Sequence, residues 1–380
     1  MQKKIISLAV AALASGAAFA QSNVTIYGIM DVGVSSYSAD SVKNYDGKGN
    51  NLKSARNTGV YSDGYTSSRL GFKGEEALGN GLKAVFQLES AISQDDKDAR
   101  WGSTRQAFVG LTSSSFGTVK LGTQSSLSDS WHGGAGAENM GNLSTRNIIG
   151  GVKGSFANTK QPGITYVSPS FSGLTVGAGA FFIDEGGEKS TVKYNGKIKN
   201  SDDRQTVYQI GANYANGPIT AAVTFAALDR DFGKSSKEYT VSGGYDFGVA
   251  KLTAGYEATK DIYMDGTASA YEGKAGLYDF ATWSLGLSVP VMANGKVHLG
   301  YSQTDNDGKK NDSEAWMLGY EHTLSKRTTV YAAYQYLDND KRAVATPAGR
   351  YANKYGKGEF QQNVADRDFD GFSIGLRHSF

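Results

Sequence analysis

Enzyme chemistry needs a base held beside a nucleophile or an activated water, and this sequence offers few candidates for either. Its four histidines are His132, His298, His322 and His378, and it has no cysteine. No acidic strand neighbour of His298 is identifiable, and His322 and His378 share the phase of apolar side chains. No Gly-x-Ser-x-Gly nucleophile elbow stands at a strand-to-helix turn, since the run at 371–375 lies within an alternating segment. The sequence therefore predicts no enzymatic activity.

Metal and cofactor motifs are equally weak. The segment 305–308, Asp-Asn-Asp-Gly, begins like a calcium loop, but it lacks the downstream bidentate Glu and is followed by lysines. No phosphate-binding loop stands in a strand-to-helix context. Loop acids at 95–98 or 202–203 would bridge to lipopolysaccharide through divalent cations or serve as ordinary loop charges. We expect no cofactor and no metal site.

Charged residues that alternate with apolar ones are the remaining functional candidates. In a strand of period two, a charge out of phase with large apolar residues faces water. Four charged residues meet this condition, each followed in parentheses by the residues that set its phase: Arg69 (Leu70, Phe72), Lys73 (in phase with Arg69), Arg105 (Phe108) and Asp31 (Ile26, Met30).

Composition limits the elements that can position these charges. The chain has 380 residues, 39% apolar and 11% aromatic, with 49 Gly and 5 Pro. It is too apolar and aromatic to be disordered, and the absence of Cys excludes a disulfide scaffold. No run of about 18 apolar residues indicates a membrane helix. A soluble globule or a β-barrel remains.

The N-terminus indicates export. Lys3 and Lys4 precede an apolar stretch at 5–17, and Ala-Phe-Ala at 18–20 forms a small-x-small cleavage site. Residues 1–20 therefore read as a signal peptide cut between Ala20 and Gln21, which leaves 21–380 as one domain. The alternative is a buried N-terminal helix. The cut removes two lysines, so the mature chain is formally neutral.

Apolar periodicity predicts strands throughout the mature chain. In the segment 313–324, Trp316, Leu318 and Tyr320 alternate with Met317 and Gly319. Strands of about 10 residues with this pattern suit a tilted crossing of a bilayer, with one face toward lipid and the other toward a lumen.

Turn signals give the number of strands. Seven hairpin turns, with the strands 24–38 and 369–380 at the ends, predict sixteen strands. The turns fall at 79–81, 116–118, 172–173, 216–218, 247–248, 294–295 and 325–327. Long polar connections alternate with them at 39–67, 95–104, 128–160, 186–206, 229–237, 262–281, 305–313 and 339–368.

This asymmetry of short turns and long loops is typical of outer-membrane barrels. In lipid an open sheet edge would leave backbone groups unsatisfied, so the first and last strands must pair. Sixteen tilted strands leave an aqueous interior. A secreted β-sandwich would also alternate, but it would not need seven short turns opposite long loops or so many aromatic residues near strand ends.

Several segments carry a family resemblance, and their order holds along the whole chain. They are VTIYG (24–28), SRLGFKGE (68–75), GLKAVFQLE (81–89), RQAFVGL (105–111), FGT (116–118), YVSP (166–169), LSKRT (324–328) and GLRHSF (375–380). With this pattern the chain resembles the general diffusion porins of Gram-negative outer membranes, particularly the trimeric β-proteobacterial type.

The resemblance implies an all-β, sixteen-stranded antiparallel transmembrane barrel that forms a homotrimer. It also implies a third long loop, here about 127–160, folded into the pore as a constriction. In the family, loop acids face an arginine ladder. The matching positions are Arg69 and Arg105 for the ladder and Asp129 and Glu138 for the loop acids, with Lys73, Asp31 and Lys160 as further pore charges.

Two departures from the family pattern reduce the number of arginines in this ladder. Leu121-Gly122 is followed by Thr123-Gln124 where an arginine is frequent, and lysines stand at 153 and 160 where an arginine is usual. Strong anion selectivity is therefore not expected, and the sequence does not fix the ion preference. For His132, on the same loop, a hydrogen-bonded structural role is favoured over a pH-sensing one.

The last strand resembles the signal that the barrel assembly machinery reads. One face carries Phe372, Ile374, Leu376 and the terminal Phe380. A plain closing strand is the alternative reading. The second connection, at 95–104, matches a loop that the family uses between subunits.

The sequence thus predicts a passive outer-membrane channel for small hydrophilic solutes and ions, reached after secretion to the periplasm. Its expected partners are outer-membrane lipid and lipopolysaccharide, the assembly machinery and two further copies of the chain, with no nucleic acid. The alternative function is a plugged barrel that acts in adhesion or ligand binding.

Overall fold

The computed structural model describes twelve stretches of the chain. These are residues 23–43, 49–96, 101–132, 139–149, 160–184, 190–194, 197–201, 204–229, 235–264, 276–307, 312–341 and 366–380. The expected cleavage site at Ala20 and Gln21 and the loop acid Glu138 lie outside these residues.

Almost all of the described elements are strands. They are β1 (Asn23–Ala39), β2 (Ala55–Ser62), β3 (Arg69–Gly79), β4 (Leu82–Ile92), β5 (Trp101–Ser113), β6 (Gly117–Ser125), β7 (Lys160–Val167), β8 (Leu174–Asp184), β9 (Ser190–Tyr194), β10 (Lys197–Ser201), β11 (Arg204–Asn216), β12 (Ile219–Asp229), β13 (Ser236–Asp246), β14 (Lys251–Met264), β15 (Gly276–Val291), β16 (Gly295–Asn306), β17 (Ser313–Ser325), β18 (Thr328–Asn339) and β19 (Phe369–Ser379). No helix in the described stretches is long and apolar enough to cross a membrane.

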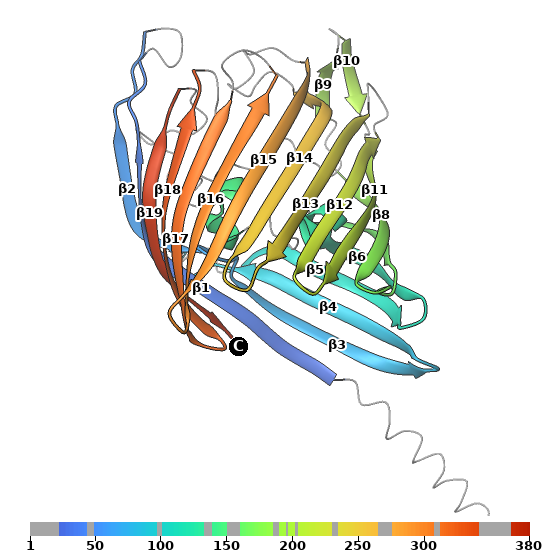
Figure 1. Cartoon of the computed structure of the whole chain (residues 1–380). Helices are drawn as coiled ribbons and strands as arrows, with labels where there is room; N and C mark the ends of the chain where they lie inside the picture. Colours follow the sequence, from blue (N-terminus) through green and yellow to red (C-terminus); the bar gives the residue numbers. More distant parts are fainter. Residues whose placement is uncertain are drawn as a thin grey trace, which may run out of the picture.

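The strands close into one antiparallel barrel (Figure 1). Neighbours in sequence pair from β3 to β8 and from β11 to β19, β8 pairs with β11, and β1 closes the ring against β19. On its other side β1 pairs with β2 over 32–39 and with β3 over 23–29, so β2 and β3 share one position. The described strands therefore fill sixteen positions, which confirms the predicted barrel.

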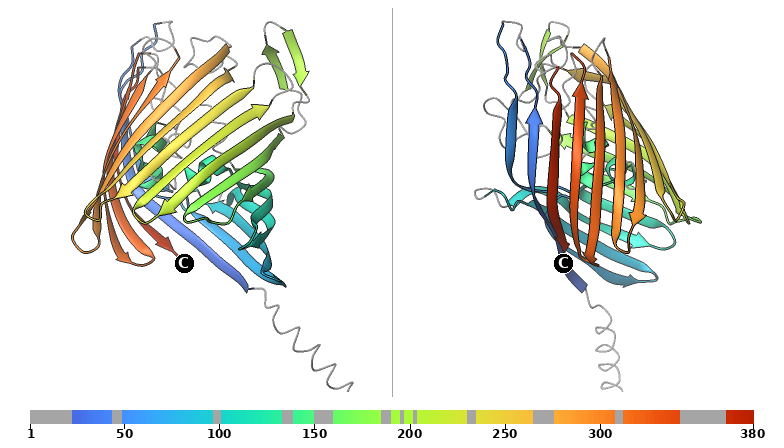
Figure 2. Two further views of the ribbon diagram at one scale, coloured as in Figure 1. Left: turned by 45° about the vertical axis from the view of Figure 1, so that its right-hand side comes forward. Right: turned by 60° about the vertical axis from the view of Figure 1, so that its left-hand side comes forward.

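Two expected loops contain extra strands. The connection predicted at 39–67 includes β2, and the one at 186–206 includes the hairpin of β9 and β10, which forms a separate two-stranded sheet. In Figure 2 this hairpin stands apart from the wall at the end that carries the long connections. The seven predicted hairpin turns are confirmed, and they lie at the opposite end, near the C-terminus.

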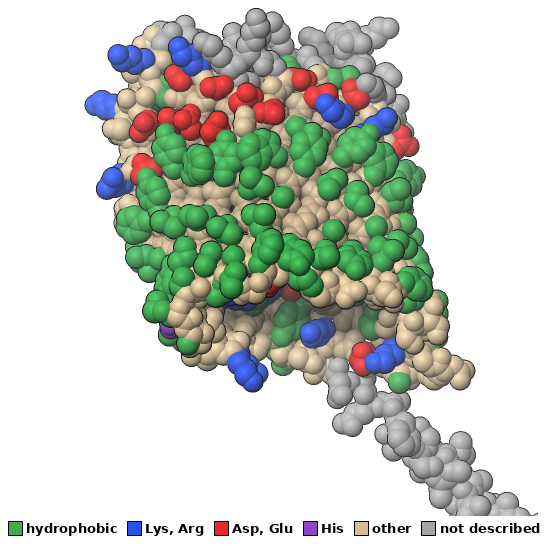
Figure 3. All heavy atoms as spheres, in the orientation of Figure 1, with side chains coloured by type: hydrophobic (Ala, Val, Ile, Leu, Met, Phe, Trp, Pro, Cys, Tyr) green, Lys and Arg blue, Asp and Glu red, His purple; other side chains and the backbone are tan. Residues whose placement is uncertain are grey.

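The outer wall is apolar where the sequence pattern predicts it. On β17 the outward Trp316 and Leu318 are each 54% exposed, whereas Ala315 and Met317, which alternate with them, are buried. Figure 3 shows the result as a broad apolar band across this face of the wall, with acidic side chains above it toward the long connections. A band of this kind places the barrel in a hydrocarbon layer.

The connection between β6 and β7 folds into the barrel, as the resemblance implies. Its described part contains α2 (Leu127–Trp131), η3 (Gly141–Leu143) and α3 (Thr145–Ile148), seen inside the wall in Figure 1. Wall side chains hold it in place: Gln209 accepts the Leu127 N–H at 2.9 Å, and Gln335 donates to the Leu143 carbonyl at 3.0 Å. We call its described parts, 127–132 and 139–149, the inward segment.

Candidate functional site: the pore constriction

A cavity of about 530 Å³ lies between the inward segment and the wall of β3, β4 and β5. Four of the residues singled out from the sequence line it together: Arg69, Arg105, Asp129 and Lys160. Two further charged lining residues, Glu89 and Arg146, were not among the sequence candidates, and neither was the polar Gln87 beside them. Because the inward segment lies inside the barrel and faces this wall across the cavity, we call the cavity the constriction.

Two arginines converge on one carboxylate at the wall. Arg105 Nε lies 2.7 Å from Glu89 Oε1, and Arg69 Nη1 lies 3.8 Å from the same oxygen. Arg69 Nε also donates to the Ser67 carbonyl at 2.9 Å. Because a guanidinium stays ionised and binds through a planar fork, these contacts fix two permanent cations side by side. Glu89 alternates with the outward Leu88, and this alternation is the signal by which the sequence could have identified Glu89 as a lumen-facing residue.

Arg105 reaches the lumen by a different route from the expected one. The sequence pattern places Phe108 outward and Arg105 inward, but in the structure Phe108 is buried on the lumen side and Val109 is 63% exposed on the outside. The register of β4 with β5 shifts between Glu89 and Ser90, so Arg105 is an extra residue. A β-bulge of this kind re-aims a side chain, and it turns Arg105 inward. The phase expected for Phe108 is wrong.

The inward segment contributes a paired acid to the lining of the constriction. Asp129 lies on α2, where Ser126 caps the helix by accepting the Asp129 N–H at 3.1 Å. Lys160, at the start of β7, places its Nζ 3.0 Å from Asp129 Oδ2. Both side chains are about one-quarter exposed, and this ion pair lines the same cavity as the arginines.

The inward segment is fastened to the wall by a buried charge cluster. Arg146 on α3 places Nη2 2.8 Å from Glu257 Oε2 on β14, and His132 Nε2 lies 3.7 Å from the same oxygen. All three side chains are almost fully buried. Burial and then the Arg146 charge lower the pKa of His132 to about 4, while Glu257 opposes the shift. His132 is therefore neutral at ordinary pH beside a paired arginine.

Asp31 does not face pore water, contrary to the sequence expectation. Its side chain is fully buried. Oδ2 accepts the N–H groups of Tyr65 and Thr66 at 3.0 and 2.6 Å, and Oδ1 accepts the Tyr331 hydroxyl at 2.6 Å. A carboxylate with this many donors is an anchor, and it fixes the short connection where the partner of β1 changes from β2 to β3.

Lys73 lies on the lumen side but outside the constriction. It lines a separate cavity of about 510 Å³ with Lys120, closer to the short turns. Its Nζ lies 5.1 Å from the centroid of the Tyr27 ring, within range of a cation–π contact.

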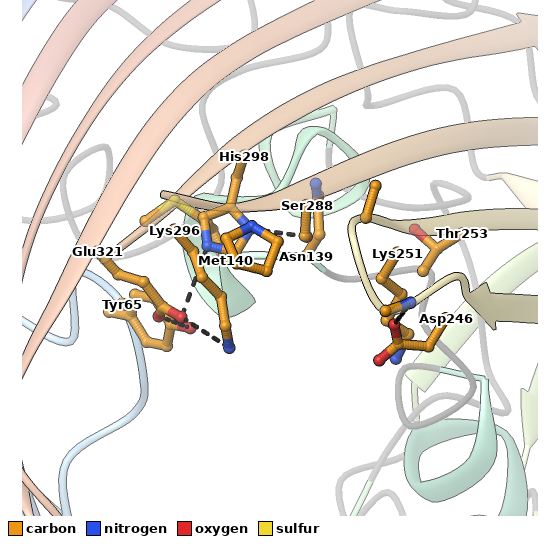
Figure 4. A pocket seen from close by; sticks show the side chains of 13 residues that line it. Tyr65, Asn139, Met140, Asp246, Lys251, Thr253, Ser288, Lys296, His298 and Glu321 are labelled. Carbon is orange, nitrogen blue, oxygen red and sulfur yellow. Dashed lines mark hydrogen bonds and ion pairs between the residues drawn. The ribbon is translucent and has the colours of Figure 1, made fainter. Parts of the chain in front are cut away.

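A third cavity, of about 270 Å³, lies on the lumen wall near the short turns (Figure 4). Glu321 at its edge accepts the Tyr65 hydroxyl at 2.8 Å and lies 3.4 Å from Lys296 Nζ. His298 Nε2 lies 3.7 Å from Glu321, and His298 Nδ1 is 2.8 Å from the Ser288 hydroxyl. No acidic neighbour of His298 is evident along the sequence, and the pairing of β16 with β17 supplies one. We call this space the turn-end cavity.

Together, the closed barrel, the apolar band and the charged constriction define a membrane β-barrel channel. A family model described as Gram-negative porin matches residues 7–342. The chain belongs to this Gram-negative porin family, and it is a passive diffusion channel of the outer membrane.

Individual relatives agree with this assignment. The chain is 32% identical to outer membrane porin protein 32 of Delftia acidovorans over the full length of both chains. It is 27% identical to major outer membrane protein P.IB of Neisseria lactamica, over 91% of this chain and 96% of the relative. Among solved structures, the anion-selective porin from Comamonas acidovorans superimposes with a TM-score of 0.68 at 27% identity, covering 95% of this chain and 100% of that one.

Proposed function

We propose that the constriction selects ions and small solutes by charge, with a weak preference for anions. The observation that carries this proposal is the lining: Arg69, Arg105 and Lys160 face the gap, while the lining carboxylates Glu89 and Asp129 are both ion-paired. Fixed cations in a narrow aqueous gap attract anions and repel cations. The two acids keep the excess of positive charge small, so the preference is modest. A structural relative is an anion-selective porin, which supports the same direction.

Reversal potentials in a salt gradient test this proposal. Replacing Arg69 and Arg105 by Gln removes two cations from the gap, so the reversal potential of the reconstituted channel should move toward the cation side. Lys260→Gln is the control, because Lys260 is exposed and paired with Asp279 away from the constriction. An unchanged reversal potential in the double variant would show that neither arginine contributes to charge selectivity.

We also propose that the protein has no catalytic activity. Within the described residues, the nearest approach to a triad is Ser288, His298 and Glu321, in which the serine is well placed but Glu321 lies 3.7 Å from the imidazole. That distance exceeds a hydrogen bond, and Glu321 already accepts a tyrosine hydroxyl, so it does not orient the ring as a triad acid would. Ester and peptide hydrolysis assays on folded protein should give no turnover above a Ser288→Ala variant.

We propose that the chain assembles as a homotrimer in contact with lipopolysaccharide, after the assembly machinery reads its last strand. A solved relative at 17% identity is a trimer form. The outward face of β19 carries Phe372, Ile374 and Leu376, each at least 43% exposed. Phe380 pairs with Gly28 through two backbone hydrogen bonds of 3.1 Å. Deleting Phe380 should lower the amount of heat-resistant trimer in membranes, and normal assembly would contradict the signal role.

The N-terminus is expected to be processed on export. We propose that residues 1–20 are a signal peptide and that 21–380 form the mature barrel. Sequencing the N-terminus of protein purified from outer membranes should give Gln21 as the first residue.

A further inference from the structure

A tyrosine that does not line the constriction contacts a carboxylate that does. Tyr27 on β1 donates its hydroxyl to Glu89 Oε2 at 2.8 Å, and Gln87 Nε2 donates to the Tyr27 oxygen at 2.6 Å. Glu89 therefore has its two oxygens assigned to different partners, since Oε1 receives Arg105 at 2.7 Å. Tyr27 holds the carboxylate in the orientation that presents Oε1 to the arginines.

A glycine on the neighbouring strand makes room for this tyrosine. Tyr27 stands directly opposite Gly71 in the register of β1 with β3. A Cβ built on Gly71 would overlap the Tyr27 ring, with the ring carbon Cζ and the hydroxyl as its nearest atoms. The ring therefore lies flat across the glycine, an arrangement in which an aromatic side chain covers an adjacent glycine in a sheet. Only a residue without a Cβ leaves this space free.

We propose that Tyr27, seated on Gly71, is a positioning residue for ion selectivity that acts through Glu89. Its hydroxyl offsets part of the carboxylate charge and keeps Oε2 away from the guanidinium groups. Without the hydroxyl, Oε2 is uncompensated and the carboxylate is free to rotate toward Arg105. Both changes lower the positive potential in the gap. The inference rests on the proposed charge selectivity of the constriction.

The central experiment is a double-mutant cycle read out as the anion-to-cation permeability ratio from reversal potentials. Tyr27→Phe retains the ring and removes only the hydroxyl, and we expect it to lower the ratio by about twofold at most, less than Arg105→Gln does. In a Glu89→Gln background the same change should have no effect, because the carboxylate through which Tyr27 acts is gone.

Two further variants separate positioning from general damage. Gly71→Ala should shift the ratio in the same direction as Tyr27→Phe, because its Cβ displaces the ring. Tyr334→Phe removes a hydroxyl from the outer wall, where Tyr334 is 49% exposed, and should leave the ratio unchanged.

The outcomes distinguish this inference from the proposed function. If Arg105→Gln shifts the ratio and Tyr27→Phe does not, the positioning role of Tyr27 is wrong, while the proposed charge selectivity of the constriction is supported. A Tyr27→Phe shift that persists in the Glu89→Gln background would also overturn it, because Tyr27 would then act on solutes directly. If Arg105→Gln itself has no effect, the proposed charge selectivity fails.

Discussion

Two cavities of the lumen are built around the same motif and differ in their cations. In the constriction Glu89 accepts a hydroxyl from Tyr27, and in the turn-end cavity Glu321 accepts one from Tyr65, both at 2.8 Å. Two basic side chains lie beside each carboxylate. They are Arg69 and Arg105 at Glu89, and Lys296 and His298 at Glu321.

The two cavities differ in how rigidly their charged side chains are held and in their net charge. The arginines at Glu89 are each no more than 21% exposed, whereas Lys296 is 53% exposed on a flexible stem. The constriction has more cations than acids along its lining, while the turn-end cavity balances two lysines against Asp246 and Glu321. Fixed, unbalanced charge distinguishes the constriction from the turn-end cavity, and charge selectivity should therefore arise there.

The largest expected effect concerns the anchor that holds the constriction in place. Glu257→Gln leaves the Arg146 charge buried without its carboxylate, and breaking such a pair from one side costs about 3 kcal/mol or more. We expect the variant to unfold at a clearly lower denaturant concentration and to show noisier single-channel currents. Glu314→Gln on the exposed outer wall is the matched control, with a change below about 1 kcal/mol. If Glu257→Gln unfolded at the same denaturant concentration as the wild-type protein, the anchor would contribute little to stability.

A smaller effect should follow from pH at the same anchor. The folded pKa of His132 is about 4, below its ordinary 6.5, so the unfolded chain binds the proton first as the pH falls. Stability from this group is complete above about pH 6.5 and declines toward pH 4, with a loss of about 2 kcal/mol near pH 5. His132→Asn should flatten this part of the curve of unfolding free energy against pH. An equally steep decline in the variant would assign the pH dependence to other groups.

Local features of the fold were accessible from the sequence. Turn residues such as Gly79-Asn80-Gly81 and the alternation around Trp316 act through neighbouring residues, and they led to sixteen strands. The missed β2 depends on a tertiary contact, because Asp31 fixes the connection that allows β2 and β3 to share one partner. The local alternation of apolar and polar residues does not indicate such a change of strand partner.

The constriction was accessible only in part, for a similar reason. Arg69 follows from alternation, but Arg105 faces the lumen because of a bulge whose position depends on the pairing of β4 with β5. Glu89 and Arg146 gain their roles from partners far away in sequence, at Tyr27 and Glu257. A single sequence predicts which face of a strand a side chain occupies more readily than it predicts which residue that side chain contacts.

The smallest expected effect compares the two carboxylates directly. Glu89→Gln removes a negative charge from the gap, and an anion passing at about 10 Å in water then gains roughly 0.4 kcal/mol. A passing cation loses the same amount while salt screening reduces both changes, so the anion-to-cation permeability ratio should rise about twofold. Glu321→Gln makes the same chemical change outside the constriction, beside the exposed and flexible Lys296, and the ratio should shift less than in Glu89→Gln. Equal shifts in the two variants would mean that selectivity is spread along the lumen, and the contrast between the two cavities would not hold.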